Sequence, residues 1–427
     1  MSKLVIKNGR VIDPSQQLDR VCDLAIENGI VREIGPDLQV LGSDEFDASG
    51  LIVAPGFIDM HVHLREPGFE HAETIETGSR TAAAGGFTSI CCMPNTQPVN
   101  DNATVTNYIR DQARRFASVN VFPIGAITKG SGGEELSAIA SMKKAGIVAI
   151  SDDGRPVMNA RVARRAMEFA QALDLSLIEH CEDLHLSAGG DMHEGIESTR
   201  LGLRGIPRSS EDVMVARDIL LAEVTGCRYH VAHISSKNSV EMVGFAKRRG
   251  LKVTAEATPH HFALTDSEMR PYDSNYKMKP PIRERCDANA VSEGLVSGAI
   301  DAIATDHAPH PGAEKMQEFE RCPFGIIGLE TAVGLALEHL YHPGKLDLSR
   351  FVQLFTNNPA RIVSIDRGTL RAGAPADITI FGLDHEWTYD VNRSPSKSRN
   401  TPFHGHKFRG GPIATIVGGQ VVWKMDA

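Results

Sequence analysis

Apolar and polar residues alternate near both ends of the chain, in short runs of the length that β-strands have. Two runs near the N-terminus contain an Asn-Gly pair, at Asn8-Gly9 and at Asn28-Gly29. Asn-Gly favours a two-residue hairpin turn, because both residues tolerate a positive φ. The C-terminal end shows the same pattern in Ala376–Phe381, Ala414–Val417 and Gln420–Trp423, with Gly418-Gly419 before the last run. We expect a small β-sandwich-like domain built from both termini, residues 1–55 and 365–427.

The middle of the chain repeats a different pattern, in which a short β-rich run ends in a polar loop and a helix-like stretch follows. The runs are Phe57–His63, Phe87–Pro94, Val121–Thr128, Ile147–Asp152, Leu175–His180, Tyr229–Ile234, Lys252–Thr258 and Ala302–Asp306. The predicted helices include Asp101–Ala117, Glu134–Ala145, Asn159–Leu173, Ser210–Val224 and Asn238–Arg249, with N-caps at Asp101, Asn159 and Ser210. This repeat predicts an α/β fold, a (β/α)₈ TIM-type barrel over residues 56–364.

Composition narrows the class of partner. The chain has 45 basic and 54 acidic side chains, a formal net charge of −9, which argues against nucleic acid or an anionic membrane surface. No apolar stretch approaches the ~20 residues of a membrane helix, and no secretory signal is present. The 7 cysteines include no C-x-x-C pair. We expect a reduced, cytoplasmic protein that acts on a small molecule.

Histidine and aspartate recur where the predicted strands end. His61 and His63 close the first run, and residues two apart on a strand share a face, so both imidazoles can reach one metal ion. Later runs end near Asp152-Asp153, His180, His233 and Asp306. In a barrel these ends meet at the active-site face, and imidazole and carboxylate are suitable zinc ligands. The pattern predicts a two-metal site for hydrolysis, with Asp306 placed to move the proton.

Strand alternation favours one residue over its neighbour at several of these ends. Asp152 and Asp153 cannot both point inward, and we favour Asp153 as the ligand. His230 and His233 are three apart, so we expect His233 to face the metal ions and His230 to pack outward. The pair His260-His261 is interpreted as lying behind the ligands in a loop.

Two segments, Asp59–Pro67 and Ala304–His310, carry a resemblance to a known family. Together with Met93–Thr96, Ser151–Gly154, Glu179–Glu182, Pro323–Ile326 and Gly373–Asp377, they resemble the dihydroorotase family, in its longer bacterial class I form within the amidohydrolase superfamily. The resemblance covers nearly the whole chain. It implies reversible cyclisation of N-carbamoyl-L-aspartate to (S)-dihydroorotate in pyrimidine (UMP) biosynthesis.

The resemblance also implies the parts of the site. It implies two Zn²⁺ ions, one bound by His61, His63, Asp153 and Asp306 and the other by Asp153, His180 and His233. A metal-bridging hydroxide would attack the ring amide, with Asp306 as general base and acid. Substrate contacts would come from His63, Arg65, Asn95, His310, Phe324 and Gly325, with Arg65 and His310 forming a cationic pocket for the substrate carboxylate. We expect a homodimer, and association with aspartate carbamoyltransferase is compatible with the sequence.

One position departs from the family pattern. Lys279 stands in Lys277–Pro281 where many relatives have a substrate-contacting asparagine, so its side-chain role is open. Two other functions share parts of this pattern. A hydantoinase or allantoinase usually bridges its metal ions with a carboxylated lysine after the fourth strand, and Ser151–Gly154 offers no lysine. A non-catalytic scaffold for aspartate carbamoyltransferase would be expected to lose ligands, and every proposed ligand is present.

Overall fold

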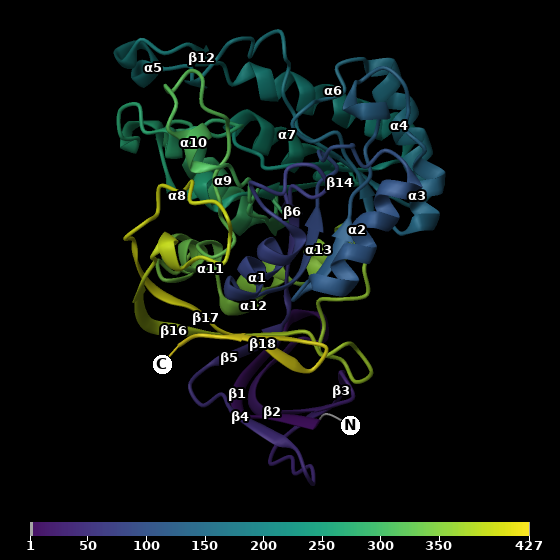
Figure 1. Cartoon of the computed structure of the whole chain (residues 1–427), viewed down its shortest axis with the longest axis vertical. Helices are drawn as coiled ribbons and strands as arrows, with labels where there is room; N and C mark the ends of the chain where they lie inside the picture. The colour runs from purple at the N-terminus through teal and green to yellow at the C-terminus, as the bar shows by residue number, and fades with distance from the viewer. Residues whose placement is uncertain (1–2, 427) are drawn as a thin grey trace.

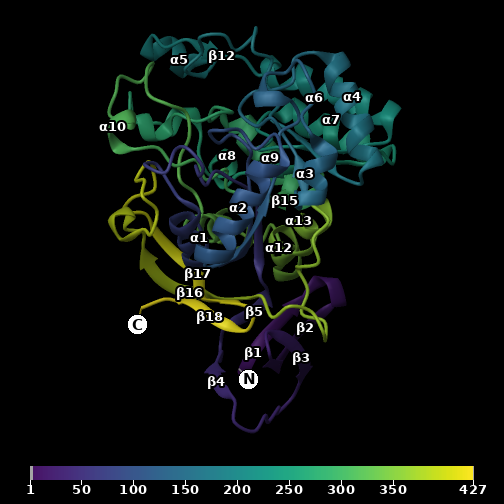
Figure 2. The same ribbon diagram turned by 45° about the vertical axis from the view of Figure 1, so that its right-hand side comes forward.

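The computed structural model describes residues 3–426 and has an α/β fold (Figure 1). A mixed eight-stranded sheet lies at one end of the molecule, and both ends of the chain run into it (Figures 1 and 2). Its order is β18-β17-β16-β5-β1-β2-β3, with β4 paired to β1. The strands are β1 (Lys3–Asp13), β2 (Leu18–Glu27), β3 (Ile30–Gly35), β4 (Asp44–Asp47), β5 (Ile52–Pro55), β16 (Ile378–Thr388), β17 (Lys407–Val417) and β18 (Gln420–Lys424).

Two of the three predicted turns join strands of this sheet. Asn28-Gly29 links β2 to β3 and Gly418-Gly419 links β17 to β18, all with positive φ. The predicted hairpin at Asn8-Gly9 is wrong, because both residues lie inside β1. There Asn8 has φ 61° and the pairing with β2 shifts register between Ile6 and Gly9, a β-bulge. A Cβ on Gly9 would lie 2.5 Å from Val53 of β5, so the bulge also permits a close approach of two strands.

A parallel strand is present at each of the eight predicted runs and is shorter than predicted in every case; the strands Asn120–Pro123 and Arg228–Val231 begin one residue before their predicted runs. Three strands form the sheet β6-β7-β8, and five form β15-β14-β13-β10-β9. Single parallel bridges continue the pairing from Gly125 to Ile150 and from Val62 to His307. The strands are β6 (Phe57–Val62), β7 (Phe87–Cys92), β8 (Asn120–Pro123), β9 (Ala149–Ile150), β10 (Ser176–Glu179), β13 (Arg228–Val231), β14 (Val253–Ala257) and β15 (Ala302–Ile303). A separate short pair joins β11 (Met192–His193) to β12 (Gly205–Ile206).

Helices separate and cover these parallel strands (Figure 2). All five helices named from the sequence are present, but only one of the three predicted N-caps is confirmed. Asn159 caps its helix through Arg161 N, whereas Asn102 takes the place of Asp101, and Ser210 lies inside its helix after Arg208. The helices are α1 (Ile75–Ala84), α2 (Ala103–Phe116), α3 (Ile139–Ala145), α4 (Ala160–Ala172), α5 (Ile196–Leu201), α6 (Ser209–Thr225), α7 (Lys237–Arg248), α8 (Pro259–Ala263), α9 (Arg285–Ser297), α10 (Gly312–Lys315), α11 (Ala332–Ala336), α12 (Leu348–Phe355) and α13 (Asn357–Ile362).

An aromatic cluster holds the mixed sheet against the parallel strands. Phe57 at the start of β6 stacks on Phe355 of α12 with ring centroids 5.0 Å apart, and lies 5.6 Å from Phe381 of β16. All three rings are fully buried. Burial of one such side chain stabilises a fold by roughly 1.5–3 kcal/mol. The cluster fixes the position of the start of β6. It thereby also fixes where His61 and His63, at the other end of this strand, lie relative to the neighbouring strands.

No helix within residues 3–426 is both long enough and apolar enough to cross a membrane.

Candidate metal centre and active site

Buried histidines and aspartates from five different strand ends meet at one place. In each of these strands a run of buried apolar residues is followed by a histidine or aspartate at or near its carboxyl end. These side chains therefore converge where the parallel strands finish. The distance between His61 Nε2 and Asp153 Oδ1 is 3.3 Å, between His63 Nε2 and Asp306 Oδ1 3.0 Å, and between His233 Nε2 and Asp153 Oδ1 3.5 Å. The structure therefore brings together the ligands predicted from sequence, which are His61, His63, Asp153, His180, His233 and Asp306.

The donor atoms fit a metal site. The ligand atoms of His61, His63 and Asp306 lie within 4.8 Å of one another, as do those of His61, Asp153 and His233. His61 Nε2 and Asp153 Oδ1 are buried and have no hydrogen-bond partner among the described residues. Buried polar atoms are normally satisfied, and imidazole nitrogen with carboxylate oxygen is a donor set that zinc accepts.

Two of these residues occupy an unusual backbone conformation. His233 has φ 29° and Asp306 has φ 49°, both in the left-handed region that residues with a side chain avoid. Arg65, next to the cluster, has φ 60°. Such conformations cost of order 1–3 kcal/mol each and gather at functional sites. Here they turn the chain at the strand ends so that the side chains face the shared site.

The two neighbouring aspartates after β9 have separate roles. Asp152 accepts hydrogen bonds from Ile127 N at 2.8 Å and Thr128 N at 3.1 Å, which ties the end of β9 to the loop after β8. Burial raises the pKa of Asp152 to about 6. Asp153 instead points at the histidine cluster. Nearby His61 and His63 hold the pKa of Asp153 well below its usual value against the effect of burial.

Glu256 lies behind the cluster and was not predicted. Its Oε1 is 2.6 Å from His61 Nδ1 and its Oε2 is 3.2 Å from His230 Nε2. Burial would raise the pKa of Glu256, but His61 and His230 lower it to about 2. The expectation that His230 packs outward is wrong. It assumed that side chains alternate regularly as far as His233, but β13 ends at Val231 and His233 has a positive φ, so the two histidines need not face opposite sides. No local signal in β14 distinguishes Glu256 from a strand carboxylate that faces solvent.

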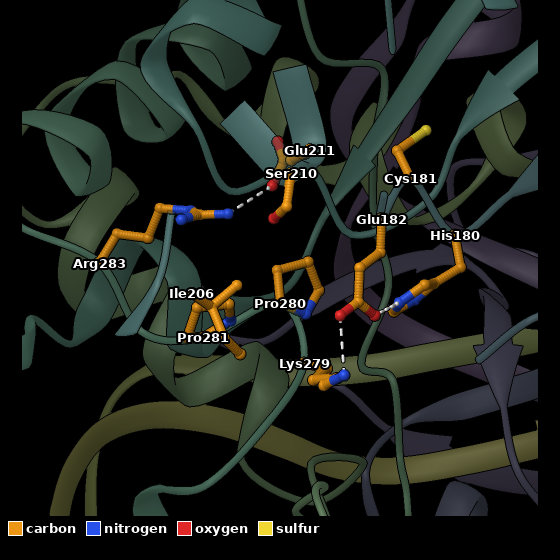
Figure 3. Close-up of a pocket in the computed structure, with 10 residues that line it drawn as sticks. All are labelled: His180, Cys181, Glu182, Ile206, Ser210, Glu211, Lys279, Pro280, Pro281 and Arg283. Atoms are coloured by element: carbon orange, nitrogen blue, oxygen red, sulfur yellow. Dashed lines mark hydrogen bonds and ion pairs between the residues drawn. The ribbon is translucent and has the colours of Figure 1, made fainter. Parts of the chain in front are cut away.

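Glu182, also not predicted, supports His180 from the other side. Its Oε2 is 3.0 Å from His180 Nε2, and its Oε1 accepts from Lys279 Nζ at 2.7 Å (Figure 3). The remaining ring nitrogen of His180, Nδ1, lies 2.9 Å from His233 Nε2. Glu182 is buried and its pKa is lowered, because His180 and Lys279 outweigh the desolvation of the carboxylate.

A cavity of about 300 Å³ opens above the cluster. Every residue predicted to contact substrate lines it, namely His63, Arg65, Asn95, Lys279, His310, Phe324 and Gly325. Asn95 Oδ1 lies 2.9 Å from His63 Nδ1, so Asn95 also orients that histidine. Lys279 reaches the cavity wall with its ammonium bonded to Glu182.

The charges at the cavity rim differ in one respect from expectation. Arg65 Nε donates to Pro309 O at 3.1 Å, and His310 Nε2 donates to Phe324 O at 2.8 Å. Burial, with Arg65 and Lys315 nearby, lowers the pKa of His310 to about 3. His310 is therefore neutral near pH 7, and the expectation that it supplies positive charge is wrong. Arg65 is the cation at this edge of the cavity.

His260 and His261 lie behind the site on the short helix α8, rather than in a loop. His261 Nδ1 is 2.7 Å from Thr258 Oγ1, and its Nε2 is 2.9 Å from Pro280 O. Both imidazoles are buried, and burial lowers both pKa values. Both ring nitrogens of His261 thus have hydrogen-bond partners, and His261 holds the segment around Pro280 in place.

Comparisons with known proteins show which family the chain resembles. A family model described as dihydro-orotase-like matches residues 50–239. The chain is 67% identical to the dihydroorotase of Solibacter usitatus, over 99% of each chain. It is 55% identical to the dihydroorotase of Pelotomaculum thermopropionicum, over 98% of each. Among solved structures, the L-hydantoinase (dihydropyrimidinase) of Arthrobacter aurescens superposes with a TM-score of 0.89 at 26% identity, covering 100% of this chain and 97% of that one.

Proposed function

Because this chain belongs to the dihydroorotase family, we propose that its buried histidine and aspartate cluster is a two-zinc active site. Membership makes the chain a metal-dependent cyclic amide hydrolase. Its reaction is the reversible cyclisation of N-carbamoyl-L-aspartate to (S)-dihydroorotate, in de novo pyrimidine biosynthesis. The observation that carries the site is the convergence of His61, Asp153 and Asp306, with Asp153 between the two groups of histidines.

The proposed ligands divide into two sets that share one carboxylate. His61, His63, Asp153 and Asp306 would hold one zinc ion, and Asp153, His180 and His233 the other. The short separations among the donor atoms of His61, His63, Asp153, His233 and Asp306 support a metal site here, and the division into two sets follows the family resemblance. Zinc held there supplies Lewis-acid polarisation of the amide carbonyl and an activated water at neutral pH.

Asp306 is the proposed general base and acid. Its Oδ1 lies 3.0 Å from His63 Nε2, and the nearby histidines lower its pKa despite burial, so the carboxylate is ionised. In the hydrolytic direction Asp306 would take the proton of the attacking water and deliver it to the departing ring nitrogen. Asp306 lines the cavity in which the ring would bind.

Arg65 is the proposed partner of the substrate carboxylate. A guanidinium is planar and pairs with a carboxylate through two parallel hydrogen bonds. Arg65 is held from behind by Pro309 O, which fixes the side chain along the cavity rim. Neutral His310, Asn95 and the backbone at Phe324-Gly325 would orient the remaining polar groups of the ring.

We further propose that the eight parallel strands close into a barrel over residues 56–364, next to a composite domain of residues 1–55 and 365–427. The bridges Gly125–Ile150 and Val62–His307 would join the two parallel sheets at both edges. Likeness to the dihydropyrimidinase of Brevibacillus agri (TM-score 0.86, 23% identity, 99% of this chain and 95% of that one) supports this fold. We assign the chain to the class I form within the amidohydrolase superfamily.

We also propose a cytoplasmic location and an oligomeric state for the enzyme. All 7 cysteines of the sequence are free thiols, which suits the reducing cytoplasm. Val213, Leu220 and Val224 lie at seven- and four-residue spacing on α6 and are exposed, so this face supports a homodimer. Association with aspartate carbamoyltransferase is compatible with the same surface.

Turnover of the purified protein tests the function directly. Dihydroorotate, hydantoin and allantoin are each assayed with zinc and after chelation. We expect zinc-dependent hydrolysis of dihydroorotate only. Turnover of hydantoin or allantoin in its place would contradict the proposed substrate, and unchanged turnover after complete metal removal would contradict the zinc site.

A further inference from the structure

Lys279 forms a continuous chain of contacts with a proposed zinc ligand. Its Nζ donates to Glu182 Oε1 at 2.7 Å, and Glu182 Oε2 is 3.0 Å from His180 Nε2 (Figure 3). Lys279 and Glu182 are 97 residues apart in sequence, so the fold creates this contact. The lysine therefore reaches the metal centre through one carboxylate.

The carboxylate in this chain determines which nitrogen of His180 faces the site. Glu182 is an acceptor, so the Nε2 that faces it carries the proton and Nδ1 keeps its lone pair. Nδ1 lies 2.9 Å from His233 Nε2 and 3.9 Å from Asp153 Oδ1, among the other proposed ligands. Carboxylates that hold ligating histidines in this way contribute to metal affinity.

Glu182 itself needs a cation. Its side chain is 8% exposed, and an ionised carboxylate that has lost its water is costly unless it is paired. Lys279 supplies that charge. Its ammonium also lies 4.8 Å from the centroid of the Phe324 ring, a cation–π distance that limits where the side chain can move.

The same contacts make Lys279 a poor partner for the substrate carboxylate. The Lys279–Glu182 pair carries no net charge, so the pair adds no positive charge to the cavity that it borders. Arg65 has no carboxylate within salt-bridge distance among the described residues, and its charge is free for an anionic ligand. The departure from asparagine at position 279 thus has its effect on the metal side of the site.

We propose that Lys279 is a positioning residue that holds Glu182, and through it His180, in the orientation that binds the second zinc ion. This inference rests on the proposed two-zinc site. Removing the ammonium leaves Glu182 with His180 as a partner but without a lysine cation, and the carboxylate then moves toward water. His180 loses its fixed ring orientation, and the zinc ion shared by Asp153, His180 and His233 binds more weakly.

Zinc affinity is the measurement that separates this role from substrate binding. Wild type, Lys279→Met, Lys279→Arg and Glu182→Gln are each equilibrated against a chelator of known zinc affinity. We expect Lys279→Met and Glu182→Gln to weaken binding of the zinc ion held by Asp153, His180 and His233 by about 10- to 100-fold. Lys279→Arg, which keeps the charge, should recover most of this loss. Lys129→Met is the matched control, since Lys129 pairs with Glu135 at the surface and its side chain is 58% exposed.

A double variant tests the connection itself. If Lys279 acts through Glu182, adding Lys279→Met to Glu182→Gln should change zinc affinity by less than about twofold. At saturating zinc, the KM for dihydroorotate of Lys279→Met should stay within about threefold of wild type. If Lys279→Met does not fold, Lys279→Gln replaces it in every comparison.

Two results would overturn the inference. One is wild-type zinc affinity in the folded Lys279 variant. The other is a KM at least about tenfold higher with zinc affinity unchanged, which would make Lys279 a substrate contact. The affinity measurement needs no substrate, so a wild type that binds two zinc ions but does not hydrolyse dihydroorotate would contradict only the proposed reaction.

Discussion

His61 and Glu256 are joined through Nδ1 and Oε1 at 2.6 Å, and both side chains are fully buried. This contact leaves His61 Nε2 pointing toward Asp153 and Asp306, at 3.3 and 3.5 Å. Glu256 also contacts His230, so two imidazoles share one carboxylate. The pair therefore fixes one ligand of the first proposed zinc ion from beneath the site.

Glu256→Gln should weaken zinc binding while preserving shape. The amide is nearly isosteric, but it removes the negative charge that makes His61 a stronger ligand. We expect zinc affinity or turnover to fall by about 10- to 100-fold. Chelator competition and turnover at saturating zinc measure the two effects. Glu135→Gln, at an exposed position, is the control, and equal zinc affinity in both variants would contradict this role.

The site residues at or just after the strand ends were predictable because two local signals coincide there. Apolar runs mark the strands, and a histidine or aspartate at the end of a run marks the site. His230 shows the limit of such reasoning, since alternation holds only as far as Val231. Asn8-Gly9 shows another limit, because a turn and a bulge both use positive φ, and contact with Val53 accompanies the bulge.

Glu256 and Glu182 could not be predicted for a related reason. Each is one carboxylate among many, and its role depends on a partner distant in sequence. Glu256 is 195 residues from His61, and Glu182 is 97 residues from Lys279. Only folding brings these groups together. The ligands themselves have sequence signals, whereas the two glutamates that orient them have none.

Asp306→Asn should abolish most turnover without unfolding the chain. Asparagine has a similar size and can retain a metal contact, but it cannot accept a proton from the attacking water. We expect kcat to fall by about 10²- to 10⁴-fold. The measurement is turnover at saturating zinc with the zinc content determined in parallel.

The control for Asp306 is Asp174→Asn. Asp174 is 84% exposed and pairs with Arg228 near a strand start, so this variant should behave as wild type. A folded, zinc-loaded Asp306→Asn enzyme with wild-type kcat would rule out the proton-transfer role.

Arg65→Met should act on substrate binding. It removes the cation proposed to bind the substrate carboxylate and keeps most of the aliphatic stem. Losing one partner of a buried charge pair costs about 2–5 kcal/mol, so kcat/KM should fall at least about 30-fold, mainly through KM. Arg65→Lys should lie between, because it keeps the charge but loses the planar pair of donors. Steady-state kinetics measure the effect, with the exposed Arg114→Met as the control. An unchanged KM in Arg65→Met would contradict the role of Arg65 in binding the substrate carboxylate.

Chelation should remove both activity and part of the stability. The ligand side chains are buried close together, so zinc binds the folded chain much more strongly than the unfolded one. At free zinc about 100 times the Kd, one site stabilises the fold by about 2.7 kcal/mol. Tm is measured with and without chelator, followed by zinc addition. A Tm that does not respond to zinc would argue against a site in this cluster.

His193→Gln should reduce the sensitivity of the fold to acid. Burial and the neighbouring Arg283 and Arg208 lower the pKa of His193 to about 4, against an ordinary value of 6.5. Between these two pH values the unfolded chain binds a proton that the folded chain does not, so the free energy of unfolding decreases as pH falls. One such group contributes up to about 1.4 kcal/mol per pH unit in this window. Denaturant unfolding at pH 7 and pH 5 should therefore show a smaller loss in His193→Gln than in wild type, by about 1–2 kcal/mol, while the exposed control His71→Gln should match wild type. Equal losses in all three proteins would mean that His193 titrates alike in the folded and unfolded chains.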